Sequence, residues 1–261
     1  MRPVENEVHG DRGRKTIVLL PPLAGSSELF APFRDRLAEH HRVVTLELPG
    51  MGDLKAEWPM ASTPSLARSA LTACRAHDIH GATLFGISLG GMIAQWMAIE
   101  DRDQRFDSLV LASTAARGRD ARFSLARVVA LGRAMLARDP HAEVGLLLSA
   151  RVRDGDTELA SRMTAAMRDH HHDRKELIGL ALVAARHDAA AALARVSIPT
   201  LVISGARDRV FDAAAQIDLA ERLHARHEVI DGAGHDVTLD APGETARLVL
   251  SCLDRDASRR Q

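Results

Sequence analysis

The sequence contains no tyrosine, and its aromatic residues are limited to six phenylalanines and two tryptophans. A phenol is therefore excluded as acid, base or oxyanion donor, so a reactive site must use other groups. Cysteine is also scarce, and Cys74 and Cys252 lie too far apart in the chain to form a ligand cluster. We expect two buried thiols in a reducing compartment rather than a disulfide or a zinc site.

Long apolar runs are also missing. No stretch reaches the roughly 18 apolar residues that a membrane span needs. Segment 1–15 is polar and charged, unlike a secretory signal. The formal net charge is −1, which argues against the concentrated basic surface of a nucleic-acid-binding protein. We therefore predict a cytoplasmic protein whose partners include neither nucleic acid nor a membrane, and leave a homodimer open.

Short apolar runs rich in β-branched residues alternate with helical patterns along much of the chain. The 261 residues, 46% of them apolar, suffice for one large domain with an insertion. The expected strands are 16–20, 42–46, 82–87, 108–112, 199–204 and 227–230, and the helices between and after them are 27–39, 64–76, 89–100, 213–223 and 243–253. This alternation predicts an α/β fold with a mostly parallel, doubly wound sheet covered on both faces.

The alternation stops in the middle of the chain. Only helical patterns occur there, at 123–137, 142–152, 158–168 and 175–185. We predict a helical cap, or lid, at residues 116–194, inserted into a core formed by residues 1–115 and 195–261.

Ser88 lies between a predicted buried strand and a predicted helix, in the sequence G-I-S-L-G. A tight strand-to-helix turn of this kind requires small residues at Gly86 and Gly90, because side chains there would collide with neighbouring backbone. The turn would lift the hydroxyl to the carboxyl edge of the sheet, where open α/β sheets place ligands. Ser88 is therefore a candidate nucleophile.

A serine nucleophile needs a base, and that base needs an orienting group. His235 follows the last predicted strand and Asp208 follows the strand before it, so the chain order is Ser, Asp, His. His235 would take the Ser88 proton, and Asp208 would hold the imidazole in the required tautomer. In the alternative interpretation, Asp208 only caps the next helix and the acid comes from elsewhere, near Asp107 or Asp120.

The oxyanion formed by such a nucleophile requires two backbone donors. One candidate is the N–H of Leu89, directly after Ser88. The other should lie in the loop after the first buried strand. Pro21 and Pro22 have no N–H, so Leu23 is the first available donor there.

These motifs resemble the α/β-hydrolase superfamily over nearly the whole chain. The segments G-I-S-L-G-G-M-I-A-Q-W (86–96) and L-V-L-A-S-T-A-A-R (109–117) are similar to the 3-oxoadipate enol-lactonase and carboxylesterase branch. Pro21-Pro22 stand where the family usually has His-Gly, a pair that the enol-lactonase branch also lacks. Asp236, directly after the histidine, departs from relatives that often have a small or apolar residue there; it either perturbs the pKa of His235 or points to solvent.

The resemblance implies a serine hydrolase that cleaves a carboxylic ester, lactone or thioester through an acyl-enzyme, without cofactor or metal. Met92 is a candidate for the acyl pocket, with core packing as the alternative. Arg117 is a candidate partner for a substrate carboxylate, with a solvated face as the alternative. The run 170–172 of histidines is not expected to bind metal, because adjacent side chains on a helix point in different directions.

Three further interpretations stay open at this point. One is an enol-lactonase-like enzyme specifically, because the elbow and the S-T-A-A sequence at 113–116 carry that similarity. Another is non-hydrolytic acyl chemistry, such as a cyclase or lyase step, which depends on whether water reaches the acyl-enzyme. The last is a non-catalytic receptor that retains the three residues and binds its ligand.

Overall fold

The computed structural model describes residues 6–10, 14–23, 27–47, 61–121, 145–169 and 174–258. One seven-stranded sheet with the order β1-β3-β2-β4-β5-β6-β7 organises the molecule. The strands are β1 (Asn6–His9), β2 (Thr16–Leu20), β3 (Arg42–Leu46), β4 (Ala82–Ile87), β5 (Phe106–Ala112), β6 (Thr200–Gly205) and β7 (Arg226–Ile230). Every neighbouring pair is parallel except β1 with β3. The predicted mostly parallel sheet is confirmed.

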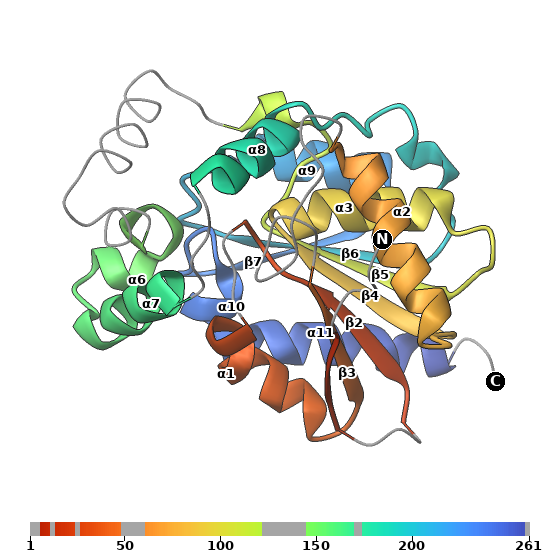
Figure 1. Ribbon diagram of the computed structural model, residues 1–261, viewed down its shortest axis with the longest axis horizontal. Coiled ribbons are helices and arrows are strands. Elements are labelled where there is room, and N and C mark those ends of the chain that lie inside the picture. The colour runs from red at the N-terminus through yellow and green to blue at the C-terminus, as the bar shows by residue number, and fades with distance from the viewer. Residues whose placement is uncertain are drawn as a thin grey trace.

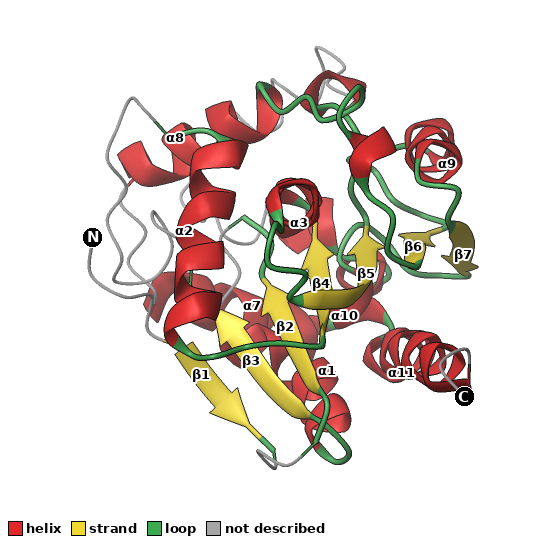
Figure 2. Ribbon diagram, turned by 90° about the vertical axis from the view of Figure 1, so that its right-hand side faces the viewer, coloured by secondary structure: helices red, strands yellow, loops and turns green. Residues whose placement is uncertain are grey.

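Helices cover both faces of this sheet (Figure 1, Figure 2). On one face lie α2 (Thr63–Ala76), α3 (Leu89–Glu100) and α9 (Ala213–Arg222), and on the other α1 (Ser27–Ala38) and α11 (Pro242–Ser258). Each face has its own apolar core, and β2 and β4 contribute buried side chains to both. This two-sided burial explains why these strands read as continuous apolar runs in the sequence.

Between β5 and β6, the described residues form helices and no named strand. The elements are the 3₁₀ turns η1 (Gly118–Asp120) and η2 (Leu193–Arg195) and the helices α6 (Ala150–Arg153), α7 (Thr157–Asp169) and α8 (Arg174–Ala185). The predicted helix at 123–137 lies outside the described residues. The cap boundaries at 116 and 194 stay a prediction.

One helix predicted in the cap, at 142–152, is wrong as a continuous element. Ser149 is extended (φ −111°, ψ 130°), and its hydroxyl accepts the N–H of Val152 at 3.1 Å. Serine favours such caps because its oxygen replaces the acceptor missing from a helix's first turn. The side chain that begins α6 therefore interrupts the helical pattern.

Other differences from the sequence predictions are small. β1 precedes the first predicted strand, and the four-residue helix α10 (Val237–Asp240) is too short for a periodic signal. Cys74 and Cys252 form no disulfide; Cys74 is buried as expected, whereas Cys252 is only half-buried. Burial raises the pKa of the Cys74 thiol to about 12. Within the described ranges, no helix combines the length and apolarity needed to cross a membrane.

Candidate active site

Ser88 forms a strained turn where β4 passes into α3. Its φ of 53° and ψ of −119° are unusual for a residue with a side chain, at a cost on the order of 1–3 kcal/mol. Two bonds hold the turn: the Ser88 N–H donates to Ala112 O at 3.0 Å, and Thr114 Oγ1 donates to Ser88 O at 2.9 Å. Both partners come from the end of β5, so the neighbouring strand fixes the conformation.

The glycines on either side of Ser88 allow close backbone approach, as the sequence predicts. A Cβ at Gly86 would lie 2.5 Å from the carbonyl oxygen of Gly90. A Cβ at Gly90 would overlap the carbonyl oxygens of Leu20 and Pro21, in the loop after β2. Any side chain at either position would displace backbone, so both glycines are required by packing.

The structure brings Ser88, His235 and Asp208 together in a chain of hydrogen bonds. His235 Nε2 lies 2.9 Å from Ser88 Oγ, and His235 Nδ1 lies 3.0 Å from Asp208 Oδ2 and 3.1 Å from Asp208 Oδ1. The His235 and Asp208 side chains are each only 2% exposed. A carboxylate can only accept, so Nδ1 carries the proton and Nε2 is free to accept from the Ser88 hydroxyl. This is the tautomer that a general base requires.

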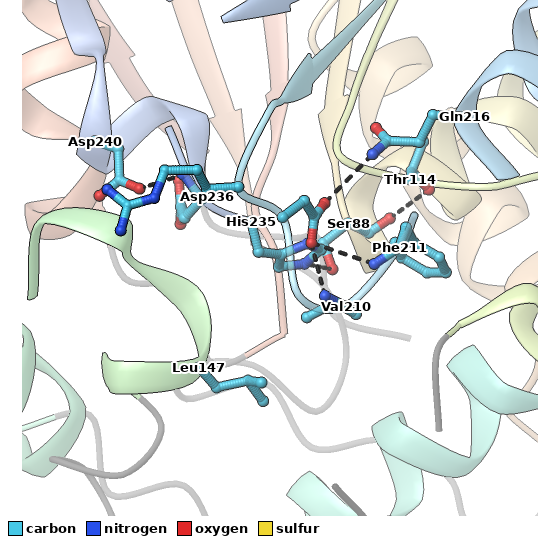
Figure 3. Close-up of polar contacts among 12 residues, drawn as sticks. Ser88, Thr114, Leu147, Val210, Phe211, Gln216, His235, Asp236 and Asp240 are labelled. Atoms are coloured by element: carbon cyan, nitrogen blue, oxygen red, sulfur yellow. Dashed lines mark hydrogen bonds and ion pairs between the residues drawn. The ribbon is translucent and has the colours of Figure 1, made fainter. Parts of the chain in front are cut away.

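The carboxylate of Asp208 is held by three donors besides the imidazole. The N–H groups of Val210 and Phe211 donate to Oδ1 at 2.7 and 3.2 Å, and Gln216 Nε2 donates to Oδ2 at 3.4 Å. Figure 3 shows these residues on the side of His235 opposite to Asp236 and Asp240. Phe211 also packs its ring against the imidazole, with centroids 5.9 Å apart.

The alternative acids lie elsewhere in the described structure. Asp107, near the start of β5, is 3.8 Å from Lys15 Nζ. Asp120 is 3.6 Å from a guanidinium nitrogen of Arg117. The position next to His235 Nδ1 is therefore occupied by Asp208.

Two carboxylates influence the protonation of His235. Burial alone lowers the pKa of this imidazole, but the charge and hydrogen bond of Asp208 and the charge of Asp236 outweigh it, so the pKa lies above its ordinary value. Asp236 does not point to solvent: it is buried and accepts hydrogen bonds from the N–H of Thr238 (3.1 Å) and the N–H of Leu239 (3.2 Å) at the start of α10. Burial raises the pKa of Asp236 itself.

The two expected oxyanion donors lie in segments that contact each other. Leu89 is the first residue of α3, where backbone N–H groups have no acceptor within the helix. Leu23 is partly buried against the core, three residues beyond the end of β2. The close approach of Gly90 to Leu20 and Pro21 joins these two segments. The role of Leu23 and Leu89 in binding an oxyanion stays a prediction.

Met92 and Arg117, the remaining predicted site residues that the structure describes, are occupied in contacts within the protein. Met92 is 2% exposed and belongs to the apolar core beneath α3. Arg117 lies 3.6–3.9 Å from carboxylate oxygens of Asp120, Asp188 and Asp218. Its charge is already balanced, which favours a structural role over a substrate clamp. The histidines at 170–172 lie outside the described residues.

Sequence reasoning missed several polar side chains that support this site. Gln216 contacts Asp208 from α9, and Thr114 contacts the Ser88 carbonyl from the end of β5. Asp240, at the end of α10, accepts the N–H of Gly234 at 2.6 Å, directly before His235. Only Thr114 had a sequence signal, because it belongs to the S-T-A-A segment; the others are brought in by the fold.

A family comparison agrees with the fold. The sequence model of the alpha/beta hydrolase fold matches residues 15–242, most of the chain. The chain belongs to the α/β-hydrolase family. The resemblance stated from the elbow and its flanking strands is thereby confirmed, as is the fold class.

Relatives of this α/β hydrolase include enzymes that act on esters and lactones. It is 31% identical to a pimeloyl-[acyl-carrier protein] methyl ester esterase of Xanthomonas campestris over 228 residues, 84% of this chain and 87% of the relative. It is 27% identical to 3-oxoadipate enol-lactonase 1 of Acinetobacter baylyi, over 90% of this chain and 87% of the relative. The crystal structure of the enol-lactonase from Burkholderia xenovorans superimposes with a TM-score of 0.83 at 21% identity, covering 96% of each chain. The protein is therefore a hydrolase enzyme.

Proposed function

We propose that this α/β hydrolase cleaves a carboxylic ester, lactone or thioester through an acyl-enzyme on Ser88. The observation that carries the proposal is the hydrogen-bond chain from Ser88 Oγ through His235 to Asp208. A serine hydroxyl is a weak nucleophile until a neighbouring base removes its proton, and this chain supplies such a base together with its orienting carboxylate.

The reaction follows from this geometry. His235 Nε2 takes the Ser88 proton while Oγ attacks the substrate carbonyl, and the oxyanion accepts hydrogen bonds from the N–H groups of Leu89 and Leu23. His235 then protonates the leaving alcohol or thiol, which leaves an acyl group on Ser88. In the second half, His235 takes a proton from water, the water oxygen attacks the acyl carbon, and Ser88 recovers its proton as the acid departs.

Among the possible substrates, an acyl ester has the strongest support. The Xanthomonas methyl ester esterase is 31% identical, whereas the Acinetobacter enol-lactonase 1 is 27% identical over a similar share of the chain. A lactone is the second candidate, supported by the S-T-A-A segment beside the elbow, in which Thr114 holds the Ser88 carbonyl. Cyclase or lyase chemistry and a non-catalytic receptor are outcomes that the experiment below distinguishes.

The experiment combines covalent labelling with turnover. A fluorophosphonate should label the wild type at Ser88 and leave Ser88→Ala unlabelled. The two proteins should melt at the same temperature. p-Nitrophenyl esters of increasing chain length, the methyl ester of a dicarboxylic acyl group carried on an acyl carrier protein, and small lactones then rank the substrate classes by kcat/KM. Equal labelling of Ser88→Ala would show that the nucleophile lies elsewhere. Labelling without turnover of any ester or lactone would favour the non-hydrolytic alternatives.

A further inference from the structure

The loop that carries His235 is joined to the cap by one carboxylate. Asp240 Oδ2 accepts the N–H of Gly234 at 2.6 Å and the N–H of Ala150 at 2.7 Å. Its Oδ1 accepts the hydroxyl of Ser149 and, at 3.4 Å, the N–H of Arg151. A single side chain therefore satisfies donors from the histidine loop and from the first turn of α6.

A further hydrogen bond joins the histidine loop directly to the cap. The N–H of Asp236, directly after the histidine, donates to Leu148 O in the cap at 2.9 Å. The backbone on both sides of His235 is thus bonded, at Gly234 through Asp240 and at Asp236 directly. Gly234 permits this contact because a Cβ there would lie 2.7 Å from Ala150 N and 3.0 Å from Leu148 O.

The same cap segment also reaches the loop that carries the acid. Arg153 Nη2 donates to Arg207 O at 2.9 Å, and Arg207 Nη2 pairs with Asp154 at 2.7 Å. Residues 148–154 therefore contact the chain immediately before Asp208 as well as the chain around His235. In Figure 1, α6, α7 and α10 lie on the same side of the molecule.

We propose that Asp240 is a positioning residue, through which cap residues 148–154 hold the His235 imidazole in line with Ser88. The inference rests on the proposed function, because it assigns a role in the same reaction. Asp240 does not contact the reacting atoms; it fixes the peptide before His235. Without it, four donors around the loop lose their acceptor and the loop separates from α6. A displacement of about 1 Å between catalytic groups costs roughly 100-fold in rate.

Two variants of Asp240 give a graded test. Asp240→Ala removes all four bonds. Asp240→Asn keeps one acceptor oxygen for the N–H groups of Gly234 and Ala150, and its amide can donate to the Ser149 hydroxyl. Ser149→Ala removes the bond to Asp240 and the cap on the N–H of Val152, both on the cap side, and leaves the bond between Asp240 and Gly234 in place.

Asp101 provides a matched control at the opposite edge of the sheet. Its carboxylate accepts the N–H groups of Arg105 at 2.7 Å and Phe106 at 3.1 Å, where β5 begins. Asp101→Ala therefore removes a comparable backbone anchor far from the triad. It should lower the melting temperature without changing the chemistry.

The measurements are the fluorophosphonate labelling rate, and kcat and KM for a p-nitrophenyl ester, in folded samples. Asp240→Ala should lower the labelling rate and kcat by about 100-fold, with KM nearly unchanged. Asp240→Asn should recover most of that loss, and Ser149→Ala should cause a smaller loss of the same kind. If Asp240→Ala does not fold, the labelling rates of Asp240→Asn and Ser149→Ala still test the proposal. Each is compared with the rates of the wild type and of Asp101→Ala.

Equal labelling rates for wild type and the Asp240 and Ser149 variants would overturn the inference. So would an equal loss in Asp101→Ala, because the effect would then follow general stability. Failure of the proposed function is a separate outcome, since the wild type itself would then show no labelling that depends on Ser88.

Discussion

The two sides of the candidate active site are built in different ways. The Ser88 side is fixed within the sheet and its elbow: by the glycines at 86 and 90 and by the ends of the adjacent strands β4 and β5. The His235 side is fixed by loops outside the sheet and by the cap, with Asp208, Asp240 and residues 148–150 all supplying contacts. The candidate nucleophile is therefore positioned by the backbone of the sheet and elbow, whereas the candidate base depends on contacts that include the cap.

Among the variants that test this comparison, Asp208→Asn has the largest expected effect. We expect kcat/KM to fall by about 10⁴-fold, because an amide no longer enforces the reactive tautomer. The wild-type profile should rise with pH around a pKa above 6.5, since His235 must be neutral to act as a base. In the variant, burial dominates and the rise should move to lower pH. A pH–rate profile measures both effects, and an unshifted rise would contradict the assignment of Asp208.

Gly90→Ala tests the Ser88 side of the site. The added methyl group meets the backbone carbonyls of Leu20 and Pro21, which cannot move without opening the loop after β2. We expect a loss of labelling rate of about 100-fold and a lower melting temperature. Gly145→Ala is the matched control, because its Cβ would meet nothing closer than 3.8 Å. Wild-type labelling by Gly90→Ala would show that the elbow tolerates displacement.

His187 sharpens the comparison, because it joins the end of the cap to the elbow helix. Its ring nitrogens lie 3.0 Å from Thr63 Oγ1 and 3.3 Å from Gln95 Oε1, and burial lowers its pKa to about 4. The unfolded chain, with an ordinary histidine pKa of 6.5, binds this proton more readily. The contribution of His187 to the free energy of unfolding is therefore full above pH 6.5. It decreases as the pH falls toward 4, by at most ~3 kcal/mol.

Denaturant unfolding between pH 7 and pH 4 measures this decrease. His187→Gln should show a shallower dependence on pH, because the titrating group is gone. His77→Ala, on the exposed end of α2, should keep the wild-type dependence. We expect folded His187→Gln to label at the wild-type rate at pH 7, since its contacts avoid the histidine loop. Slow labelling of His187→Gln would instead show that the elbow depends on the cap as much as His235 does.

The smallest expected effect is that of Thr114→Val, which removes the hydroxyl bond to the Ser88 carbonyl. We expect a loss of about 1 kcal/mol in the free energy of unfolding and only a minor loss of labelling rate. The strained turn keeps its other bond to Ala112 and its glycines. Thr72→Val, which removes a similar hydroxyl bond to Arg68 O on α2, is the control. A loss of labelling as large as that of Gly90→Ala would show that Thr114 governs the elbow.

Much of the fold was readable from the sequence because its signals are local. The strands 16–20, 42–46 and 82–87 were predicted with the bounds observed, since each is a buried apolar run ended by proline, glycine or a turn. The cap was harder to predict. Ser149 reads as one polar residue in a helical pattern, and only the structure shows its extended backbone and its cap on the N–H of Val152, with which α6 begins.

The sequence by itself determined the α/β fold, the elbow at Ser88 and the order of the three polar residues at strand ends. These features follow from hydrophobic periodicity, steric demands on glycine and the edge at which parallel strands end. The tertiary structure decided which groups meet: Gln216 on Asp208, three carboxylates around Arg117, and Asp240 between the cap and His235. The contacts of Arg117 with Asp188 and Asp218, and that of Asp240 with Ala150, join segments distant in the chain. No local pattern encodes an interaction whose partners are brought together only by folding.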